Sequence, residues 1–132
     1  MQPVTVTEAS ECILSGAIAP IDLVESCLGR IAAVDDRIHS YIHVDAEGAR
    51  AAAHAAKAEL DAGNWRGPLH GLPFAVKDNY DAAGMPATAN SKTRLGNVPR
   101  QDCELVRRLK SAGAILMGKL STWEYGTGNG GE

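Results

Sequence analysis

The residue best suited to chemistry in this 132-residue chain is Lys77, which lies near the end of the segment Gly67-Pro-Leu-His-Gly-Leu-Pro-Phe-Ala-Val-Lys-Asp-Asn79. Residues 72–76 are too uniformly apolar for a strand with a solvent face, which is typical of a parallel strand covered on both sides. Ligand sites in open α/β sheets lie at the carboxyl ends of such strands. Lys77 is therefore predicted to lie at a ligand site.

The alternation of side chains along this strand determines what surrounds Lys77. Phe74 and Val76 are expected on one face and Ala75 and Lys77 on the other, so that Asp78 points away from the lysine. A lysine held among apolar groups favours its neutral form, as a general base requires. The alternative is a lysine whose stem lies along the sheet while its ammonium reaches solvent at the rim.

Composition indicates a globular protein without a nucleic-acid surface. The chain is 45% hydrophobic and has a net charge of -3, with 13 Lys and Arg against 16 Asp and Glu. The nearest basic cluster, Arg107, Arg108 and Lys110, is interpreted as the solvated face of a helix. No apolar run has the length of a membrane span, and the first residues lack the pattern of a secretory signal. A cytoplasmic location is expected.

The cysteines and histidines give no pattern typical of a metal centre. Cys12, Cys27 and Cys103 are widely spaced without a C-x-x-C pair, so we expect reduced thiols and neither a disulfide framework nor a zinc site. His39 and His43 are four residues apart, but in a strand or turn that spacing does not bring them together. We expect no metal and no cofactor.

The first half of the chain is predicted to be mainly helical. Thr7 is expected to cap a helix to about residue 15, and Pro20 to begin an amphipathic helix over residues 20–34. Residues 38–44 are a possible short strand. Asp45 is expected to cap a long alanine-rich helix that ends near residue 62.

The second half predicts a β-α-β unit. A polar loop over residues 79–101 follows the lysine strand and is long enough to line a site. Asp102 is expected to cap a helix that ends at Gly113, and residues 114–117 to form a second buried strand. Lys119 lies at the end of this second strand, just as Lys77 lies at the end of the first. Lys119 is therefore the structural comparison for Lys77.

Two or three strands cannot form a sheet that is covered on both faces, because each central strand needs a partner on either side. We therefore expect an α/β fold that is the amino-terminal part of a larger mixed α/β structure, with helices packed on an incomplete central sheet. Residues 1–65 are assigned to an amino-terminal helical region, and residues 66–132 to the first β-α-β part of the main domain.

Several segments resemble the amidase signature family in sequence and in order. They are Pro20-Ile-Asp-Leu-Val-Glu-Ser-Cys-Leu-Gly-Arg-Ile31, the segment ending at Asn79, Ala83-Gly-Met-Pro-Ala-Thr88, and Ala112-Gly-Ala-Ile-Leu-Met-Gly-Lys119. The segment that contains Lys77 is the specific one. The resemblance implies a hydrolase of carboxylic amides that uses a Ser, cis-Ser, Lys triad, in which Lys77 is the catalytic lysine.

The resemblance also implies that this chain supplies only part of the catalytic apparatus. The family's two serines lie in a Gly-Gly-Ser-Ser-Gly type of segment, and no serine here lies in one. The expected partners are therefore the remainder of the amidase domain and a small-molecule amide, and the isolated 132 residues are expected to be inactive. The identity of the amide, including a tRNA-linked one, and the formation of a homo-oligomer stay open.

Other interpretations compete with this one. Gly126-Thr-Gly-Asn-Gly-Gly131 is rich in glycine, but it lacks the lysine and the following helix of a phosphate-binding loop. His70 is expected to be a turn residue near the site. Trp123 and Tyr125 are candidates for apolar walls, although packing in the core is favoured for at least one of them. The alternative function is a noncatalytic interaction module, or a subunit fragment, that docks through an open sheet edge.

Overall fold

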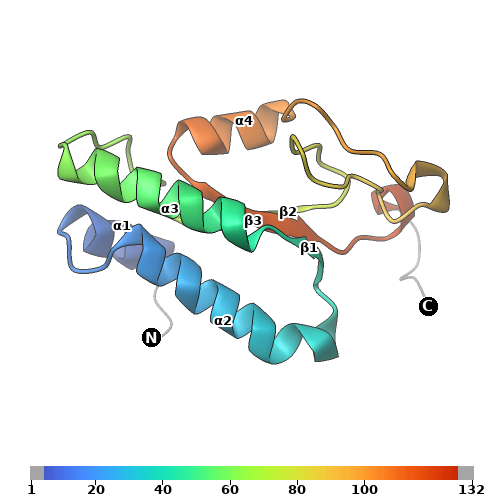
Figure 1. The fold of residues 1–132 in the computed structure, drawn as a ribbon, viewed down its shortest axis with the longest axis horizontal. Coiled ribbons are helices and arrows are strands. Elements are labelled where there is room, and N and C mark those ends of the chain that lie inside the picture. The colour runs from blue at the N-terminus through green and yellow to red at the C-terminus, as the bar shows by residue number, and fades with distance from the viewer. Residues whose placement is uncertain (1–4, 128–132) are drawn as a thin grey trace.

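The computed structural model describes residues 5–127, which form four α-helices and a three-stranded sheet. The elements are α1 (Val6–Leu14), α2 (Pro20–Ile38), β1 (Tyr41–Val44), α3 (Ala46–Asp61), β2 (Pro73–Lys77), α4 (Glu104–Ser111) and β3 (Ile115–Leu120), with short 3-10 turns at Lys92–Arg94 and Glu124–Gly126. Helices α2 and α3 run side by side along the sheet, and α4 lies on the sheet's other side (Figure 1).

The sheet is mixed, with the strand order β1-β3-β2. Strands β2 and β3 are parallel and α4 connects them, which confirms the predicted β-α-β unit. Strand β1 pairs antiparallel with β3 on its other side. The predicted regions 1–65 and 66–132 thus both contribute strands to one sheet, and their division into separate parts stays a prediction.

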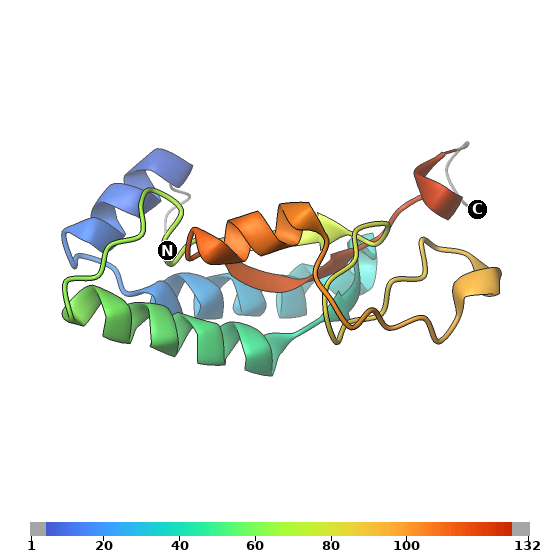
Figure 2. The same ribbon diagram turned by 90° about the horizontal axis from the view of Figure 1, so that it is seen from above.

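The two faces of the sheet are covered by different elements. Ile115 and Met117 pack with Val24 and Leu28 of α2 and with the buried alanines of α3, whose small side chains allow the helix to approach closely. Leu116 faces the other way and packs beneath α4 with Val106. Figure 2 shows this arrangement from above, with the loop over residues 79–101 extending beyond the carboxyl end of β2.

Two of the predicted helix caps were wrong. Thr5, not Thr7, caps α1, because its side chain accepts the Glu8 amide while Glu8 accepts the Thr5 amide in a capping box. Cys103, not Asp102, precedes α4, and Asp102 instead accepts the Ala83 amide and pairs with Lys110. Asp45 caps α3 as predicted, through the Gly48 amide.

Other boundaries differ from expectation by a few residues. Helix α2 continues to Ile38 and ends where His39 adopts the left-handed conformation, with φ 49°. Strand β3 extends to Leu120, which places Lys119 inside the strand. Among the helices of residues 5–127, none combines the length and apolar character that a bilayer span requires.

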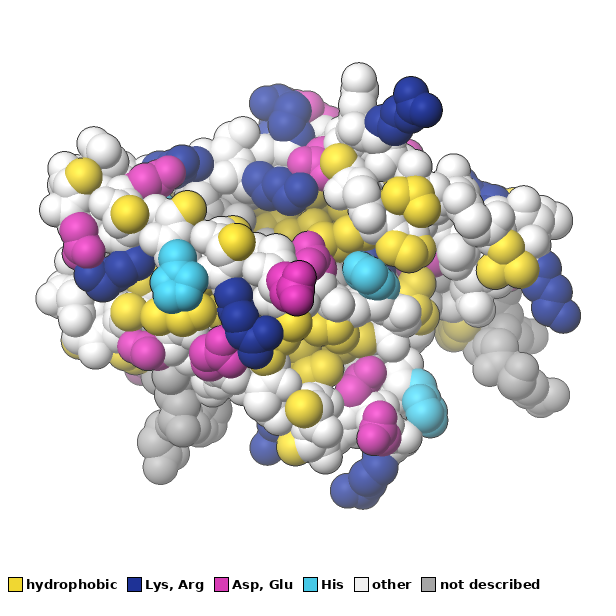
Figure 3. Space-filling view, viewed as in Figure 1, with side chains coloured by type: hydrophobic (Ala, Val, Ile, Leu, Met, Phe, Trp, Pro, Cys, Tyr) yellow, Lys and Arg dark blue, Asp and Glu magenta, His cyan; other side chains and the backbone are white. Residues whose placement is uncertain are grey.

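Apolar surface remains open between the helices. The space-filling view shows apolar side chains gathered between α4 and α3, and again between α3 and α2 (Figure 3). This uncovered surface agrees with the predicted architecture of helices packed on an incomplete central sheet.

Candidate active site

Lys77 is the last residue of β2, at the carboxyl end of the parallel pair, opposite Leu120 of β3. Its side chain is half-buried. Within residues 5–127, no carboxylate oxygen lies within 4.0 Å of its ammonium nitrogen, so the lysine is not neutralised by an ion pair there.

Gly126 lies close to the end of the Lys77 side chain. A Cβ atom added at Gly126 would lie 3.5 Å from Lys77 Nζ and 3.0 Å from Asn79 Nδ2. Gly126 has φ +77° and the preceding Tyr125 has φ 51°, so two consecutive residues adopt the left-handed conformation beside the lysine. A bulky residue at positive φ is uncommon and persists only where its surroundings hold it.

Asp78 forms a fully buried ion pair with Lys119 and is therefore unavailable to Lys77. Lys119 Nζ lies 3.1 Å from Asp78 Oδ1, and both side chains have 0% exposure. The Asp78 amide donates to Leu120 O at 2.9 Å, which keeps this residue in line with the strand. The predicted orientation of Asp78, away from Lys77, agrees with this pairing.

The carboxylate of Asp78 also holds the loop that follows β2. Its Oδ2 accepts the Thr88 hydroxyl at 2.6 Å, the Thr88 amide at 3.0 Å and the Asn90 amide at 3.4 Å. Lys119 Nζ donates in turn to Pro86 O at 3.0 Å. We call residues 86–90 the strap, since these contacts fasten it to the sheet.

The strap and the turn that follows β3 are connected directly. The Tyr125 amide donates to Ala89 O at 2.8 Å, and Ser91 Oγ donates to Glu124 Oε1 at 2.6 Å. The Tyr125 hydroxyl lies 2.8 Å from Thr93 Oγ1, and hydrogen bonds with Thr93 and Ser91 lower the pKa of Tyr125. The predicted site-lining loop over residues 79–101 thus reaches the turn that lies close to Lys77.

Sequence reasoning missed the roles of Asp78, Thr88 and Lys119. Lys119 was expected to resemble Lys77 at a strand end, but it is buried within β3 and bound to Asp78. The available signal was a charged residue inside an otherwise apolar strand, because a buried lysine requires a partner.

His70 was expected near the site, and this placement was wrong. It is a buried turn residue before β2, at the end of the strand opposite Lys77. Its Nδ1 accepts the Arg66 amide at 3.2 Å, and its Nε2 lies 3.2 Å from Glu59 Oε2. Burial is the main cause that lowers the pKa of His70, and Glu59 opposes it.

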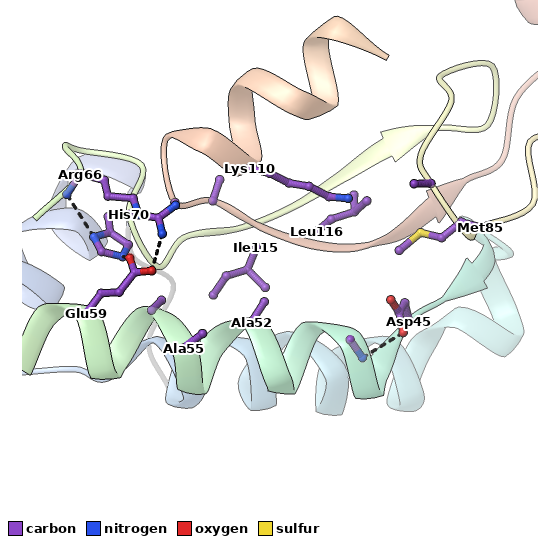
Figure 4. A pocket seen from close by; sticks show the side chains of 15 residues that line it. Asp45, Ala52, Ala55, Glu59, Arg66, His70, Met85, Lys110, Ile115 and Leu116 are labelled. Atoms are coloured by element: carbon purple, nitrogen blue, oxygen red, sulfur yellow. Dashed lines mark hydrogen bonds and ion pairs between the residues drawn. The ribbon is translucent and has the colours of Figure 1, made fainter. Parts of the chain in front are cut away.

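A groove of about 370 Å³ lies between α3, α4 and the amino-terminal half of β3. Figure 4 shows His70 and Glu59 at one end, Met85 and Asp45 at the other, and Ile115 on its floor. Lys77 is not among its lining residues, so the groove is separate from the candidate site.

The part of the chain that the structure describes holds no cluster of typical metal-binding side chains. The three cysteines are free, and no three His, Cys, Asp or Glu side chains of residues 5–127 converge. Most of the glycine-rich run from Gly126 to Gly131 lies outside the described residues.

The Amidase family profile matches residues 22–132. An amidase of Pseudomonas putida is 39% identical over 124 residues, which are 94% of this chain and 26% of that protein. The glutamyl-tRNA(Gln) amidotransferase subunit of Salinispora arenicola (strain CNS-205) is 41% identical over 122 residues, or 92% of this chain and 25% of that protein.

A solved structure of an amidase also matches this chain in fold. The native peptide amidase of Stenotrophomonas maltophilia superposes with a TM-score of 0.88 at 35% identity, covering 94% of this chain and 26% of that one. This chain spans about a quarter of the length of the curated relatives it matches. The sequence resemblance and the mixed α/β fold are thereby confirmed, and the chain belongs to the amidase family.

Proposed function

We propose that the protein containing this chain hydrolyses carboxylic amides and that Lys77 is its general base. The observation that carries the proposal is the placement of Lys77. It lies half-buried at the carboxyl end of a parallel strand, and the carboxylate nearest in sequence, Asp78, is already paired with Lys119. The membership of the chain in the amidase family supports the reaction class.

In the proposed mechanism, Lys77 acts in its neutral form within a Ser, cis-Ser, Lys triad. Its Nζ takes the proton of a bridging serine, which in turn takes the proton of the nucleophilic serine as that oxygen attacks the amide carbonyl. When the C–N bond breaks, the bridging serine gives its proton to the leaving amine and takes one back from Lys77 Nζ, and water then hydrolyses the acyl-serine ester. Both serines come from residues outside this chain.

The substrate is proposed only as a class, that of carboxylic amides. The relatives include a peptide amidase and one component of an amidotransferase named for glutamyl-tRNA, so free amides and tRNA-linked ones are both candidates.

Release of ammonia from a panel of primary amides by the full-length protein tests the proposal. We expect turnover by the wild type, little by Lys77→Ala, and none by residues 1–132 alone, which carry no Gly-Gly-Ser-Ser-Gly segment. Wild-type turnover by Lys77→Ala would remove the lysine from the mechanism.

The alternative is a noncatalytic module that docks through its sheet edge. Within residues 5–127, β2 pairs on one side only, which leaves an edge to which another strand can add. A full-length protein that hydrolyses no amide in the panel, but binds a partner through β2, would favour this alternative.

A further inference from the structure

We propose that Lys119 is a positioning residue for Lys77 and acts on it through Asp78 and the strap. This inference rests on the proposed role of Lys77 as a base. Lys119 does not touch the reacting atoms; its effect is to hold the backbone that lies close to the catalytic amine.

An irregularity in β3 turns Lys119 toward Asp78. Ile115 and Met117 face α2 and α3, and strict alternation would place Lys119 on that face as well. Instead, the register passes from Phe74 opposite Leu116 to Val76 opposite Lys119, so β3 contains one extra residue between these pairs. A bulge of this kind redirects the side chains that follow it.

Gly118 makes the bulge possible. Its φ is +152°, and a Cβ atom there would lie 2.1 Å from the carbonyl oxygen of His43 in β1. Beyond it, Lys119 lies beside Val76, on the face that Val76 shares with Asp78 and opposite to that of Lys77. The two lysines therefore leave the sheet from opposite faces.

All three donors of the Lys119 ammonium have acceptors. Lys119 Nζ lies 3.1 Å from Asp78 Oδ1, 3.0 Å from Pro86 O and 3.4 Å from Asp78 O. A buried ion pair that satisfies its hydrogen bonds fixes the geometry of its partners, since no solvent can replace either group. Lys119 thus fixes both Asp78 and the start of the strap.

The strap transmits this constraint to Lys77. Asp78 Oδ2 binds Thr88 and Asn90 on either side of Ala89, and Ala89 O accepts the Tyr125 amide. Ala89 has a φ value of 50°, a conformation that alanine keeps only when its surroundings impose it, and Asn90, with φ 53°, adopts the same conformation at less cost. The residue after Tyr125 is Gly126, which lies close to the lysine, since a Cβ atom added there would be 3.5 Å from Lys77 Nζ.

Lys119→Met in the full-length protein tests the inference. The substitution keeps an unbranched side chain, one atom shorter, and removes its three donors. We expect kcat per folded molecule to fall by about 100-fold with KM unchanged, because a displacement of about 1 Å in a catalytic group has this effect. Amide exchange measured by mass spectrometry is expected to accelerate in peptides covering the strap and residues 124–126.

Three further variants control for a role in folding alone. Thr88→Val removes the hydroxyl donor to Asp78 and is expected to lower kcat in the same direction, whereas Thr88→Ser keeps the hydroxyl and should restore it. Lys110→Met makes the same change in the partly exposed pair of Lys110 with Asp102, and should leave kcat unchanged.

The outcomes separate this inference from the proposed function. If Lys77→Ala is inactive while folded Lys119→Met retains wild-type kcat, the positioning role is refuted and the function stands. If Lys119→Met does not fold, an unchanged kcat in Thr88→Val refutes the positioning role. Wild-type activity in Lys77→Ala refutes the role of Lys77 as the base and, with it, this inference.

Discussion

Substitution of Gly118 by alanine perturbs the bulge that orients Lys119. The added Cβ atom would lie 2.1 Å from His43 O and 3.1 Å from both His43 C and Val44 Cα. These are backbone atoms, which cannot rotate away as the end of a side chain can. Strand β1 must therefore shift, or β3 must lose its bulge.

The expected cost has two parts. An alanine at φ +152° is held in a sparsely populated conformation, which costs about 1–3 kcal/mol. Overpacking against the β1 backbone adds about 1–3 kcal/mol. The sum of about 2–6 kcal/mol is a large part of the stability of an ordinary domain, about 5–15 kcal/mol.

Amide exchange of the full-length protein measures this loss locally. The relevant amides are those of β1 and of Asp45, which donates to Met117 O at 2.9 Å. A loss of at least about 2 kcal/mol in opening free energy accelerates their exchange by more than about tenfold. Gly63→Ala is the matched control, because Gly63 also has positive φ but nothing lies within 4 Å of an added Cβ atom.

The control is expected to leave exchange in β1 unchanged, since the strain at Gly63 is confined to the end of α3. Equal exchange of β1 in Gly118→Ala and in the wild type would show that the bulge does not depend on glycine. The argument that Gly118 turns Lys119 toward Asp78 would then fail.

Two further predictions concern stability. Burial lowers the pKa of His70 in the folded state, so as the pH falls the unfolded chain binds a proton at this histidine before the folded chain does. The contribution of neutral His70 to the free energy of unfolding is therefore fully present above a pH of about 6.5 and is lost as the pH falls below it. Denaturation midpoints measured at several pH values should show this loss in the wild type and a smaller loss in His70→Gln. An equal loss in the variant would assign the effect to other groups. Asp45→Ala removes the side-chain acceptor of the Gly48 amide and should destabilise α3 by about 1 kcal/mol. The measurement is amide exchange in the first turn of α3, which should become faster. Unchanged exchange there would show that solvent replaces the cap without loss.

The sequence predicted the helices and the order of elements because those features depend on local patterns. The spacing of Leu23, Val24 and Leu28 identifies α2, and Asp45 identifies the start of α3. The caps at Thr7 and Asp102 were wrong because neighbouring residues compete for the role. Thr5 gains a reciprocal bond with Glu8, and Asp102 gains an ion pair with Lys110.

The candidate site was only partly predictable for a different reason. The orientation of Asp78 follows from strand alternation, and the structure agrees with it. The orientation of Lys119 does not follow, because it depends on a bulge formed by contacts between Gly118 and β1, which is distant in sequence. His70 precedes β2 and Lys77 ends it, so their placement at opposite ends of the strand follows from the sequence, and only the contact of His70 with Glu59 of α3 depends on tertiary packing.

The most direct test of the central claim compares amide hydrolysis by full-length Lys77→Met and Lys57→Met proteins with the wild type. Lys57 is partly exposed on α3 and pairs only with Asp61 among the described residues, so its variant controls for the loss of a lysine. Removal of a general base is expected to lower kcat/KM by about 10²–10⁴-fold in Lys77→Met and to leave Lys57→Met unchanged. Equal values of kcat/KM in both variants and the wild type would contradict the assignment of Lys77 as the base.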